Sequence, residues 1–195
     1  MADFEKSYNK TMGHEGGYSS DPDDFGGETY RGISRKYHPS WPGWDTIDNY
    51  KGESGFPSSL SSNRELDYFV EFFYKEHFWD KLLGDDNPSQ VIAEEMFDNA
   101  VNMGISRSVK FLQTGLNVLN RTEKNYDNLT VDGRIGQNTL KALEKLLTVS
   151  NKEEVYLYKV INILQGYHYI SVSLSSESQE RFMRGWLNRV DFKKV

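Results

Sequence analysis

One acidic residue and the glycines behind it have the types and spacing for acid–base chemistry. Glu15 follows His14 and precedes Gly16 and Gly17, just where a short predicted helix has ended. Partial burial at such a position raises the pKa of a carboxyl group toward neutrality. A carboxyl that stays protonated can donate its proton to a glycosidic oxygen as the bond breaks, and the glycines let a polymer approach the backbone closely. Glu15 is therefore the first candidate for a general acid.

The loop that follows contains candidates for a second catalytic group, namely Asp21, Asp23, Asp24 and Thr29. In glycosidases that invert the anomeric configuration, a second carboxylate about 6.5–9.5 Å from the acid activates the attacking water. The alternative is that Glu15 and the aspartates only cap a helix and form turns, which is their common role beside glycines. The residues alone leave both interpretations open.

The elements around these residues can be predicted from hydrophobic spacing. Phe4, Tyr8 and Met12 are four residues apart and indicate one face of a short helix that ends at Gly13. Residues 15–33 are rich in Gly and Asp and predict turns or a short β-hairpin. Residues 38–62 are rich in Pro, Ser and Gly and predict an ordered surface loop with room for one short helix.

The rest of the chain is predicted to be helical, with a polar loop over 121–136. Start signals are Ser62 or Asn63, Asn87-Pro88 and Ser106. The predicted helices cover 63–83, 87–103, 106–120, 137–147, 152–170 and a last piece within 182–190. The predicted fold class is mainly α, with one Gly/Asp-rich loop or β-hairpin near the N-terminus. We expect a catalytic region over 1–86 and a helical region over 87–195, packed together as one compact unit.

Four stretches of the chain, taken together and in order, resemble one protein family. They are His14-Glu15-Gly16-Gly17-Tyr18 with Asp21-Pro22-x-Asp24-x-Gly26-Gly27-x-Thr29-x-x-Gly32-Ile33, then Phe97-Asp98-Asn99-Ala100-Val101-Asn102-Met103-Gly104, then Val131-Asp132-Gly133-x-x-Gly136-x-x-Thr139-x-x-Ala142-Leu143, and Phe182-x-x-Gly185-Trp186-x-x-Arg189-Val190. They resemble glycoside hydrolase family 108, which comprises N-acetylmuramidases with a lysozyme-like helical fold in phage endolysins and bacterial secretion activators. The third stretch resembles the peptidoglycan-binding helical module that accompanies the family's catalytic part.

The resemblance implies roles for particular residues. Glu15 matches the family's catalytic glutamate, and Asp24 or Thr29 is expected to position the attacking water. Tyr18 and Tyr30 are expected to contact the sugar. The sequence departs from the family at Phe25, where proline is usual, and at Tyr30, where asparagine is usual, so the details of sugar binding are expected to differ.

Three polar residues of the second stretch have two possible roles. Asp98 and Asn102 are four residues apart and share a helix face, with Asn99 beside them. These side chains either hydrogen-bond the sugar or form a buried network that joins the helix to the Glu15 loop. The sequence favours neither alternative.

The tryptophans and histidines are weaker indicators of a functional site than the polar residues above. Trp41 and Trp44 lie in the Pro-rich segment, so we expect them to be the more exposed tryptophans and candidates for stacking on sugar rings. The four histidines are scattered and no spacing of ligands fits zinc. The aspartates of the 21–26 loop lack the closing glutamate of a calcium loop. We expect no metal and no cofactor.

Composition limits the partners. The chain has 195 residues, a formal net charge of −6 and no cysteine. It has no basic stripe, which argues against nucleic acid as a partner, and no apolar run of transmembrane length. The first residues lack the features of a signal peptide. We expect a monomer made in the cytoplasm that acts on peptidoglycan after lysis or non-classical export.

The sequence therefore predicts a peptidoglycan hydrolase that cleaves between N-acetylmuramic acid and N-acetylglucosamine. Two alternatives stay open. A lytic transglycosylase needs only one glutamate and uses the substrate's own hydroxyl. A non-catalytic protein that binds the cell wall or assists secretion would keep the fold without the reaction.

Overall fold

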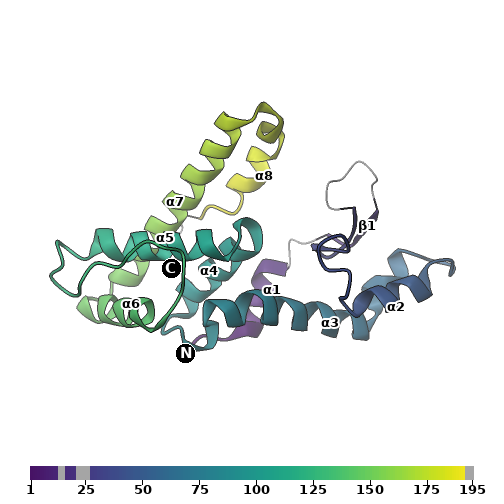
Figure 1. Cartoon of the computed structure of the whole chain (residues 1–195), viewed down its shortest axis with the longest axis horizontal. Helices are drawn as coiled ribbons and strands as arrows, with labels where there is room; N and C mark the ends of the chain where they lie inside the picture. Colours follow the sequence, from purple (N-terminus) through teal and green to yellow (C-terminus); the bar gives the residue numbers. More distant parts are fainter. Residues whose placement is uncertain (13–15, 21–26, 192–195) are drawn as a thin grey trace. The chain divides into compact units, whose positions relative to one another are not determined.

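The computed structural model of the chain describes residues 1–12, 16–20 and 27–191 and consists of two units (Figure 1). Residues 8–77 form the smaller one, which we call the hairpin unit, and residues 1–7 and 78–195 form the helical unit. Helix α1 (Phe4–Met12) begins in the helical unit and continues into the hairpin unit. Its bounds confirm the helix predicted from the spacing of Phe4, Tyr8 and Met12.

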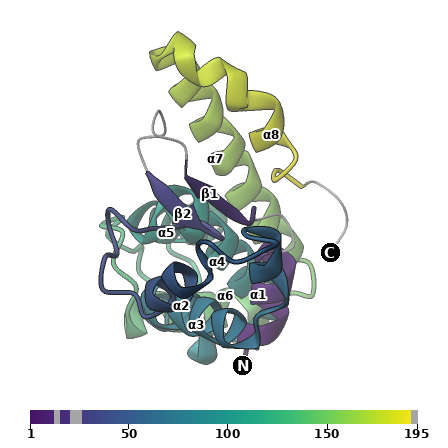
Figure 2. The same ribbon diagram turned by 90° about the vertical axis from the view of Figure 1, so that its right-hand side faces the viewer.

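The hairpin unit contains the small sheet predicted near the N-terminus. Strands β1 (Tyr18–Ser20), β2 (Glu28–Tyr30) and β3 (Ile33–Ser34) are antiparallel in the order β1-β2-β3, and Figure 2 shows β1 beside β2. Tyr18 pairs with Tyr30 and Ser19 pairs with Thr29. Because directly paired residues point to the same face of a sheet, the two tyrosines share one face and Thr29 lies on the other.

Helices follow the sheet in the same unit. They are α2 (Gly43–Tyr50), the 3₁₀-helix η1 (Ser58–Ser62) and α3 (Arg64–Tyr74). Asn63 caps α3, because its Oδ1 accepts hydrogen bonds from the N–H groups of Glu65 and Leu66 at 2.9 and 3.0 Å. This confirms the predicted start of that helix. The predicted continuation to residue 83 is replaced by short turns, namely a π-helix (Lys75–Trp79) and two 3₁₀-helices (Asp80–Leu82 and Gly84–Asp86).

Trp41 and Trp44 are buried, so the expectation that they are exposed was wrong. Trp44 is 1% exposed and Trp41 is 7% exposed. Their indole N–H groups donate to the backbone oxygens of His38 and Phe69, and their rings meet edge to face at 5.1 Å. A Cβ on Gly43 would lie 2.2 Å from the Trp41 ring, so this close packing requires glycine. The Pro-rich segment folds over its own aromatic residues, which its composition does not reveal.

The helical unit is built from α4 (Gln90–Met103), α5 (Ile105–Leu119), α6 (Gln137–Val149), α7 (Glu153–Ser175), the 3₁₀-helix η5 (Glu177–Phe182) and α8 (Met183–Leu187). Apolar side chains of α4 to α7 form its core; among them Phe97, Leu112, Leu143 and Leu157 are fully buried. Figure 1 shows α8 alongside the C-terminal part of α7, where Trp186 stacks on Tyr169 with ring centroids 5.2 Å apart.

The predicted caps of two helices in this unit were each wrong by two residues. Ser89, not Asn87-Pro88, is the N-cap of α4, since its hydroxyl accepts from the N–H of Ile92 at 3.1 Å. Helix α5 begins at Ile105, so Ser106 lies inside the helix. Helix α7 continues five residues beyond the predicted end at 170.

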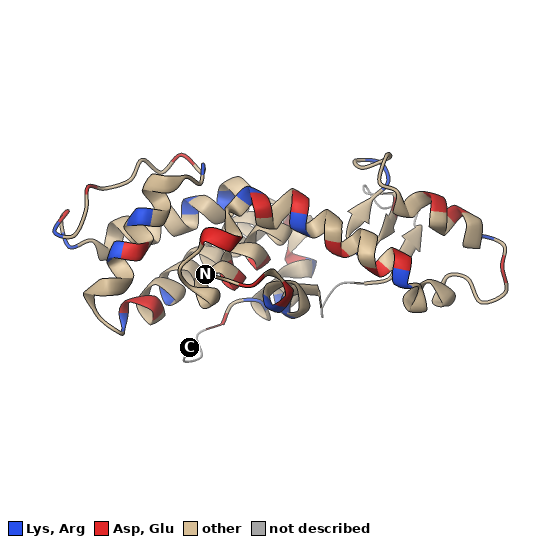
Figure 3. Ribbon diagram, turned by 90° about the horizontal axis from the view of Figure 1, so that it is seen from below, with Lys and Arg blue, Asp and Glu red and all other residues tan. Residues whose placement is uncertain are grey.

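The fold is mainly α with a small antiparallel sheet near the N-terminus, which confirms the predicted fold class. Across the described ranges, no helix is both long enough and apolar enough to cross a membrane. Acidic and basic residues are interspersed along the helices (Figure 3).

Candidate functional site

The two leading carboxylates of the predicted site lie outside the described residues. Glu15 belongs to the segment 13–15, and Asp24 belongs to the segment 21–26 together with Asp21 and Asp23. The structure describes the residues on either side of these segments, which are α1 before Glu15 and the strands β1 and β2 around the Asp-rich loop.

Thr29, the other candidate for positioning water, lies in the middle of β2. It is half-buried, and its hydroxyl donates to the backbone oxygen of Gly27 at 3.2 Å. Gly27 has a left-handed backbone (φ 63°) and is the first described residue after the Asp-rich segment. The threonine hydroxyl is thus tied to the end of the loop that contains Asp24.

The two tyrosines expected to contact sugar have different environments. Tyr18 is half-buried, packs edge to face on Phe56 at 4.9 Å and donates its hydroxyl to Glu28 at 3.0 Å. Tyr30 is only 1% exposed, and its hydroxyl donates to the backbone oxygen of Leu60 at 3.2 Å. Tyr18 therefore has ring surface for a ligand, whereas the hydroxyl of Tyr30 is already used inside the unit.

Both tyrosines line one pocket of about 350 Å³ in the hairpin unit. Arg31, Ser58 and Ser61 also line it and supply polar groups beside the aromatic ones. Arg31 has a left-handed backbone (φ 43°), which is strained for a residue with a side chain. Two interactions keep it there: its carbonyl accepts from the hydroxyl of Tyr74 at 2.8 Å, and its guanidinium pairs with Asp67 at 2.8 Å. A strained arginine at the wall of a mixed aromatic and polar pocket is a feature typical of binding sites.

Glu28 is at the centre of an ion network that sequence reasoning missed. Its carboxylate lies 2.7 Å from Nζ of Lys51 and 3.0 Å from Nη1 of Arg35, and it accepts the hydroxyl of Tyr18. Asp48 completes the network with a bidentate pair to Arg35 at 2.6 and 2.8 Å. These residues come from β1, β2, the turn after β3, and α2, so no local spacing in the sequence could have identified them.

The network keeps Glu28 ionised. Burial opposes the charged form, but the hydrogen bonds from Lys51 and Arg35 outweigh it and lower the pKa of Glu28. Hydrogen bonds from Arg35 and Lys51 also hold the pKa of Asp48 far below its usual range. Glu28 is thus unsuited to donate a proton at neutral pH, and its position instead anchors Tyr18 beside the pocket.

The candidates in α4 belong to the helical unit and divide into two kinds. Asn99 is fully buried, and its amide donates to the backbone and side-chain oxygens of Glu95 at 2.9 and 3.0 Å. Asp98 pairs with Arg189 at 2.9 Å, and Asn102 is exposed and donates to the backbone of Asp98. The burial of Asn99 favours the network alternative for that residue, while Asn102 keeps a side chain available at the surface.

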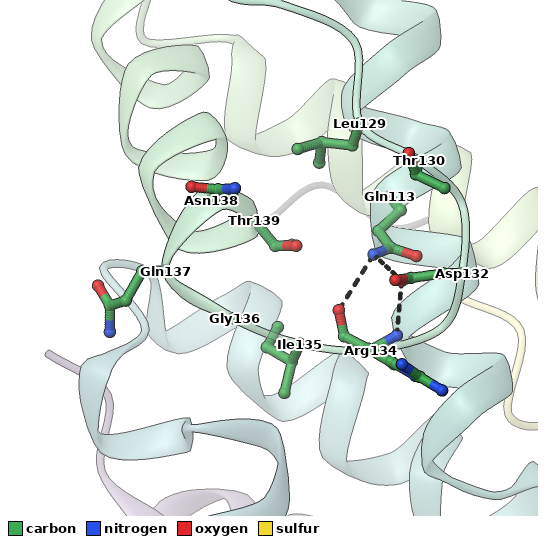
Figure 4. A pocket seen from close by; sticks show the side chains of 10 residues that line it. All are labelled: Gln113, Leu129, Thr130, Asp132, Arg134, Ile135, Gly136, Gln137, Asn138 and Thr139. Atoms are coloured by element: carbon green, nitrogen blue, oxygen red, sulfur yellow. Dashed lines mark hydrogen bonds between the residues drawn. The ribbon is translucent and has the colours of Figure 1, made fainter.

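The stretch from 131 to 139 is organised by one buried glutamine (Figure 4). Gln113 of α5 is 2% exposed; its Nε2 donates to Asp132 at 2.9 Å and to the carbonyl of Arg134 at 3.2 Å, while its Oε1 accepts from the N–H of Gly133 at 2.9 Å. Asp132 also accepts from the N–H of Arg134 at 2.9 Å. The motif that resembles a peptidoglycan-binding module is therefore a rigid turn leading into α6.

Two adjoining cavities lie along this turn. One of about 480 Å³ is lined by the turn and the first residues of α6. The other, of about 390 Å³, is lined by residues 126–130 and the next turns of α6. The two share Leu129, Thr130 and Asn138, so they adjoin each other, and we call the two together the α6 groove.

No group of three or more His, Cys, Asp or Glu residues in the described ranges could hold a metal ion. Two of the histidines, His38 and His77, lie near each other, with ring centroids 5.5 Å apart. Their neighbours are aromatic: His77 stacks on Phe73 at 4.2 Å. These histidines belong to an aromatic cluster of the hairpin unit.

Comparison with known proteins assigns the two halves of the chain to two family models. Residues 8–104 match the family model of glycosyl hydrolase 108, and residues 107–191 match that of a predicted peptidoglycan domain. The two matches meet between Gly104 and Arg107, at the junction of α4 and α5. Glu15, Asp24 and Thr29 fall within the first match, and the α6 groove falls within the second. The predicted division of the chain into regions 1–86 and 87–195 is not tested by these matches and stays a prediction.

No curated protein matches the chain. Among solved structures, one titled as the structure of Brucella abortus SagA is similar, with a TM-score of 0.55 and 24% sequence identity over 96% of this chain and 88% of that one. At this identity the likeness bears on the fold alone. The two family matches together account for nearly the whole chain, and it belongs to glycosyl hydrolase family 108, with a peptidoglycan domain in its second half.

Proposed function

We propose that this peptidoglycan hydrolase cleaves the glycan strand between N-acetylmuramic acid and N-acetylglucosamine, with Glu15 as the general acid. The observation that carries the proposal is that the glycosyl hydrolase 108 match, residues 8–104, includes Glu15 together with Asp24 and Thr29. The peptidoglycan domain that follows supports the glycan of the cell wall as the substrate.

The proposed reaction uses two groups on the hairpin unit. Glu15 gives its proton to the glycosidic oxygen as the bond to the anomeric carbon breaks. Asp24 or Thr29 positions a water whose oxygen bonds to that carbon from the opposite face, and the water's proton leaves to Asp24 or to solvent. The tie between the Thr29 hydroxyl and Gly27 supports a role for Thr29 in holding the loop of Asp24.

The pocket that Tyr18 lines is the proposed sugar site. Its aromatic ring suits the apolar face of a sugar, and Ser58, Ser61 and Arg31 suit the hydroxyl and acetamido groups. The ion network around Glu28 fixes the hydroxyl of Tyr18, so that the ring keeps one orientation. Tyr18→Ala is then expected to raise KM more than it lowers kcat.

The test is loss of turbidity of purified peptidoglycan with the wild type and with Glu15→Gln. We expect the variant to be slower by a factor of about 10² to 10⁴, the usual contribution of a general acid. Glu53→Gln is a matched control, because Glu53 is exposed in the same unit. Equal clearing by Glu15→Gln and the control would overturn the assignment of Glu15.

Product analysis separates hydrolysis from transglycosylation. Mass spectrometry of the released fragments should show reducing N-acetylmuramic acid ends that carry oxygen from labelled water. A 1,6-anhydro end in their place would show that the substrate's own hydroxyl attacks, and would replace hydrolysis by the lytic transglycosylase reaction. Binding of walls by folded wild-type protein without any release of fragments would favour the non-catalytic alternative.

A further inference from the structure

We propose that the α6 groove binds a free carboxylate of the peptide stems of peptidoglycan, at the first turn of α6. This inference deepens the function of the peptidoglycan domain and rests on peptidoglycan being the protein's substrate. It assigns to the second half of the chain a ligand chemistry, a location and a set of hydrogen-bond donors that the family match does not specify.

The first observation is an uncapped helix start that faces the groove. Gly136 is the N-cap of α6 and has no side chain to accept hydrogen bonds from the first turn. The N–H of Leu140 bonds to the carbonyl of Gly136 at 3.1 Å. The N–H groups of residues 137–139 have no acceptor within the described part of the chain. Such a first turn carries a partial positive charge and binds anions.

The second observation is independent of the backbone. Thr139 is only 4% exposed, and its hydroxyl makes no hydrogen bond to another residue in the described part of the chain. Figure 4 shows the Thr139 side chain pointing from α6 into the cavity, toward the side occupied by Gln113. The Thr139 side chain lines the cavity, so a ligand oxygen there would accept a hydrogen bond from its hydroxyl. This hydroxyl and the amides of residues 137–139 all belong to the first turn of α6.

Two positively charged side chains line the groove beyond the first turn of α6. Lys141 and Lys145 are one helical turn apart on α6 and line the adjoining cavity. Leu129 and Ile135 supply apolar surface, the first to both cavities and the second to the larger one. An extended anionic ligand with small apolar side chains matches this lining better than a compact inorganic ion does.

The acidic residues of the groove are consistent with a peptide. Asp132 uses Oδ1 to accept from Gln113 and from the N–H of Arg134, so its charge is directed into the turn. Asp127 lines the other cavity, beside the lysines. A peptidoglycan stem contains free carboxylates and, at its third residue, an ammonium group. In intact walls the glycan has no free carboxylate, because the lactyl group of N-acetylmuramic acid is amide-linked to the peptide.

The test is a titration of the full-length protein with a synthetic stem tetrapeptide, followed by isothermal calorimetry, in parallel with the same peptide whose carboxylates are amidated. The wild type should bind the free acid and not the amide. Gly136→Asp should weaken binding by at least about tenfold, because its own carboxylate would cap the amides that the ligand needs. A Cβ at Gly136 meets no atom within 4 Å, so this variant keeps the fold.

Two further pairs of variants keep the test decisive. Thr139→Ser retains the hydroxyl and should bind as the wild type does, whereas Thr139→Val should weaken binding. Lys141→Gln with Lys145→Gln should weaken binding and reduce its dependence on salt, whereas Lys152→Gln, an exposed lysine outside the groove, should not. Equal binding by Gly136→Asp, or equal binding of the amidated peptide, would overturn the proposal.

Failure of the groove proposal can be told apart from failure of the proposed hydrolase reaction. If the peptide does not bind but the wild type still clears walls, the groove proposal fails and the hydrolase proposal stands. If the peptide binds as expected and Glu15→Gln clears walls normally, the reverse holds. Binding of glycan strands stripped of peptide at the same residues would overturn the choice of ligand.

Discussion

Gln113 holds Asp132 at 2.9 Å through Nε2 and, with the other end of the same amide, holds the N–H of Gly133 at 2.9 Å. A single buried side chain on α5 thereby fixes both sides of a turn twenty residues later in the chain. This turn leads directly into the start of α6, where the proposed carboxylate site lies. The geometry of this turn, and with it the proposed carboxylate site, therefore depends on one amide.

Replacing this amide with an apolar side chain should be strongly destabilising. Gln113→Leu removes the hydrogen bonds to Asp132 and to the carbonyl of Arg134 and leaves the N–H of Gly133 without an acceptor, so we expect a loss of about 2–3 kcal/mol in the free energy of unfolding. Urea unfolding followed by circular dichroism measures it. Gln137→Leu is the matched control, because Gln137 is exposed and only a small change is expected. Equal stabilities of the two variants would show that the hydrogen bonds of Gln113 do not stabilise the fold.

Two glycines of the same turn should respond in opposite ways to alanine. Gly133 has φ 77°, and a Cβ there would lie 2.3 Å from Oγ and 2.7 Å from the backbone oxygen of Ser106. Gly133→Ala should therefore destabilise the chain by about 2–3 kcal/mol. Gly136→Ala, where the backbone is extended and no atom lies within 4 Å, should be tolerated. Thermal melting compares them; a tolerated Gly133→Ala would contradict the geometry of the turn.

The ion network of Glu28 should make the stability of the hairpin unit depend on pH. The pKa of Glu28 is lowered in the fold, so its contribution is complete above the pKa of an unfolded glutamate, about 4.3, and is lost as pH falls through the lower folded value. Glu28→Gln should cost about 1–2 kcal/mol at pH 7, and the difference from wild type should shrink toward pH 3. Tryptophan fluorescence in urea, at both pH values, measures it.

Glu53→Gln provides the comparison for that experiment, since Glu53 is exposed in the same unit. It should follow the wild type at both pH values. A gap between Glu28→Gln and wild type that stays constant from pH 7 to pH 3 would mean that the charge of Glu28 does not stabilise the fold.

The cap of α3 offers a test of local helix stability. Asn63→Ala removes an acceptor for two backbone N–H groups and should destabilise the hairpin unit by about 1 kcal/mol. Asn63→Asp should keep most of the stability, because aspartate accepts the same bonds. Ser62→Ala, one residue earlier, should change little; an equal loss there would argue against Asn63 as the cap. The measurement is urea unfolding at neutral pH.

Local patterns predicted most of the fold. The spacing of Phe4, Tyr8 and Met12, the cap at Asn63 and the loop over 121–136 were read correctly, because each depends on neighbours within a few residues. The helix starts at 87 and 106 were wrong because several residues in a row could serve as the cap, and tertiary packing chose among them.

The site could be predicted only where its residues are close in sequence. Glu15 and Asp24 stay predictions, since they lie outside the described residues. Lys51 lies 23 positions after its partner Glu28, and Asp132 lies 19 positions after its partner Gln113; no periodicity in the sequence reports such separations. The burial of Trp41 and Trp44 depends on how a Pro-rich segment folds back on α3, and composition alone indicated the opposite.

The absence of a side-chain cap at Gly136 links ligand occupancy to hydrogen exchange. Without a ligand, the amide protons of residues 137–139 face solvent and exchange quickly, while that of Leu140 is held by the carbonyl of Gly136. The proposed carboxylate would slow the exchange of those protons that the helix cannot protect by itself. The first turn of α6 is thus a built-in reporter, and it can show when the second half of the protein is attached to the wall without any measurement of cleavage.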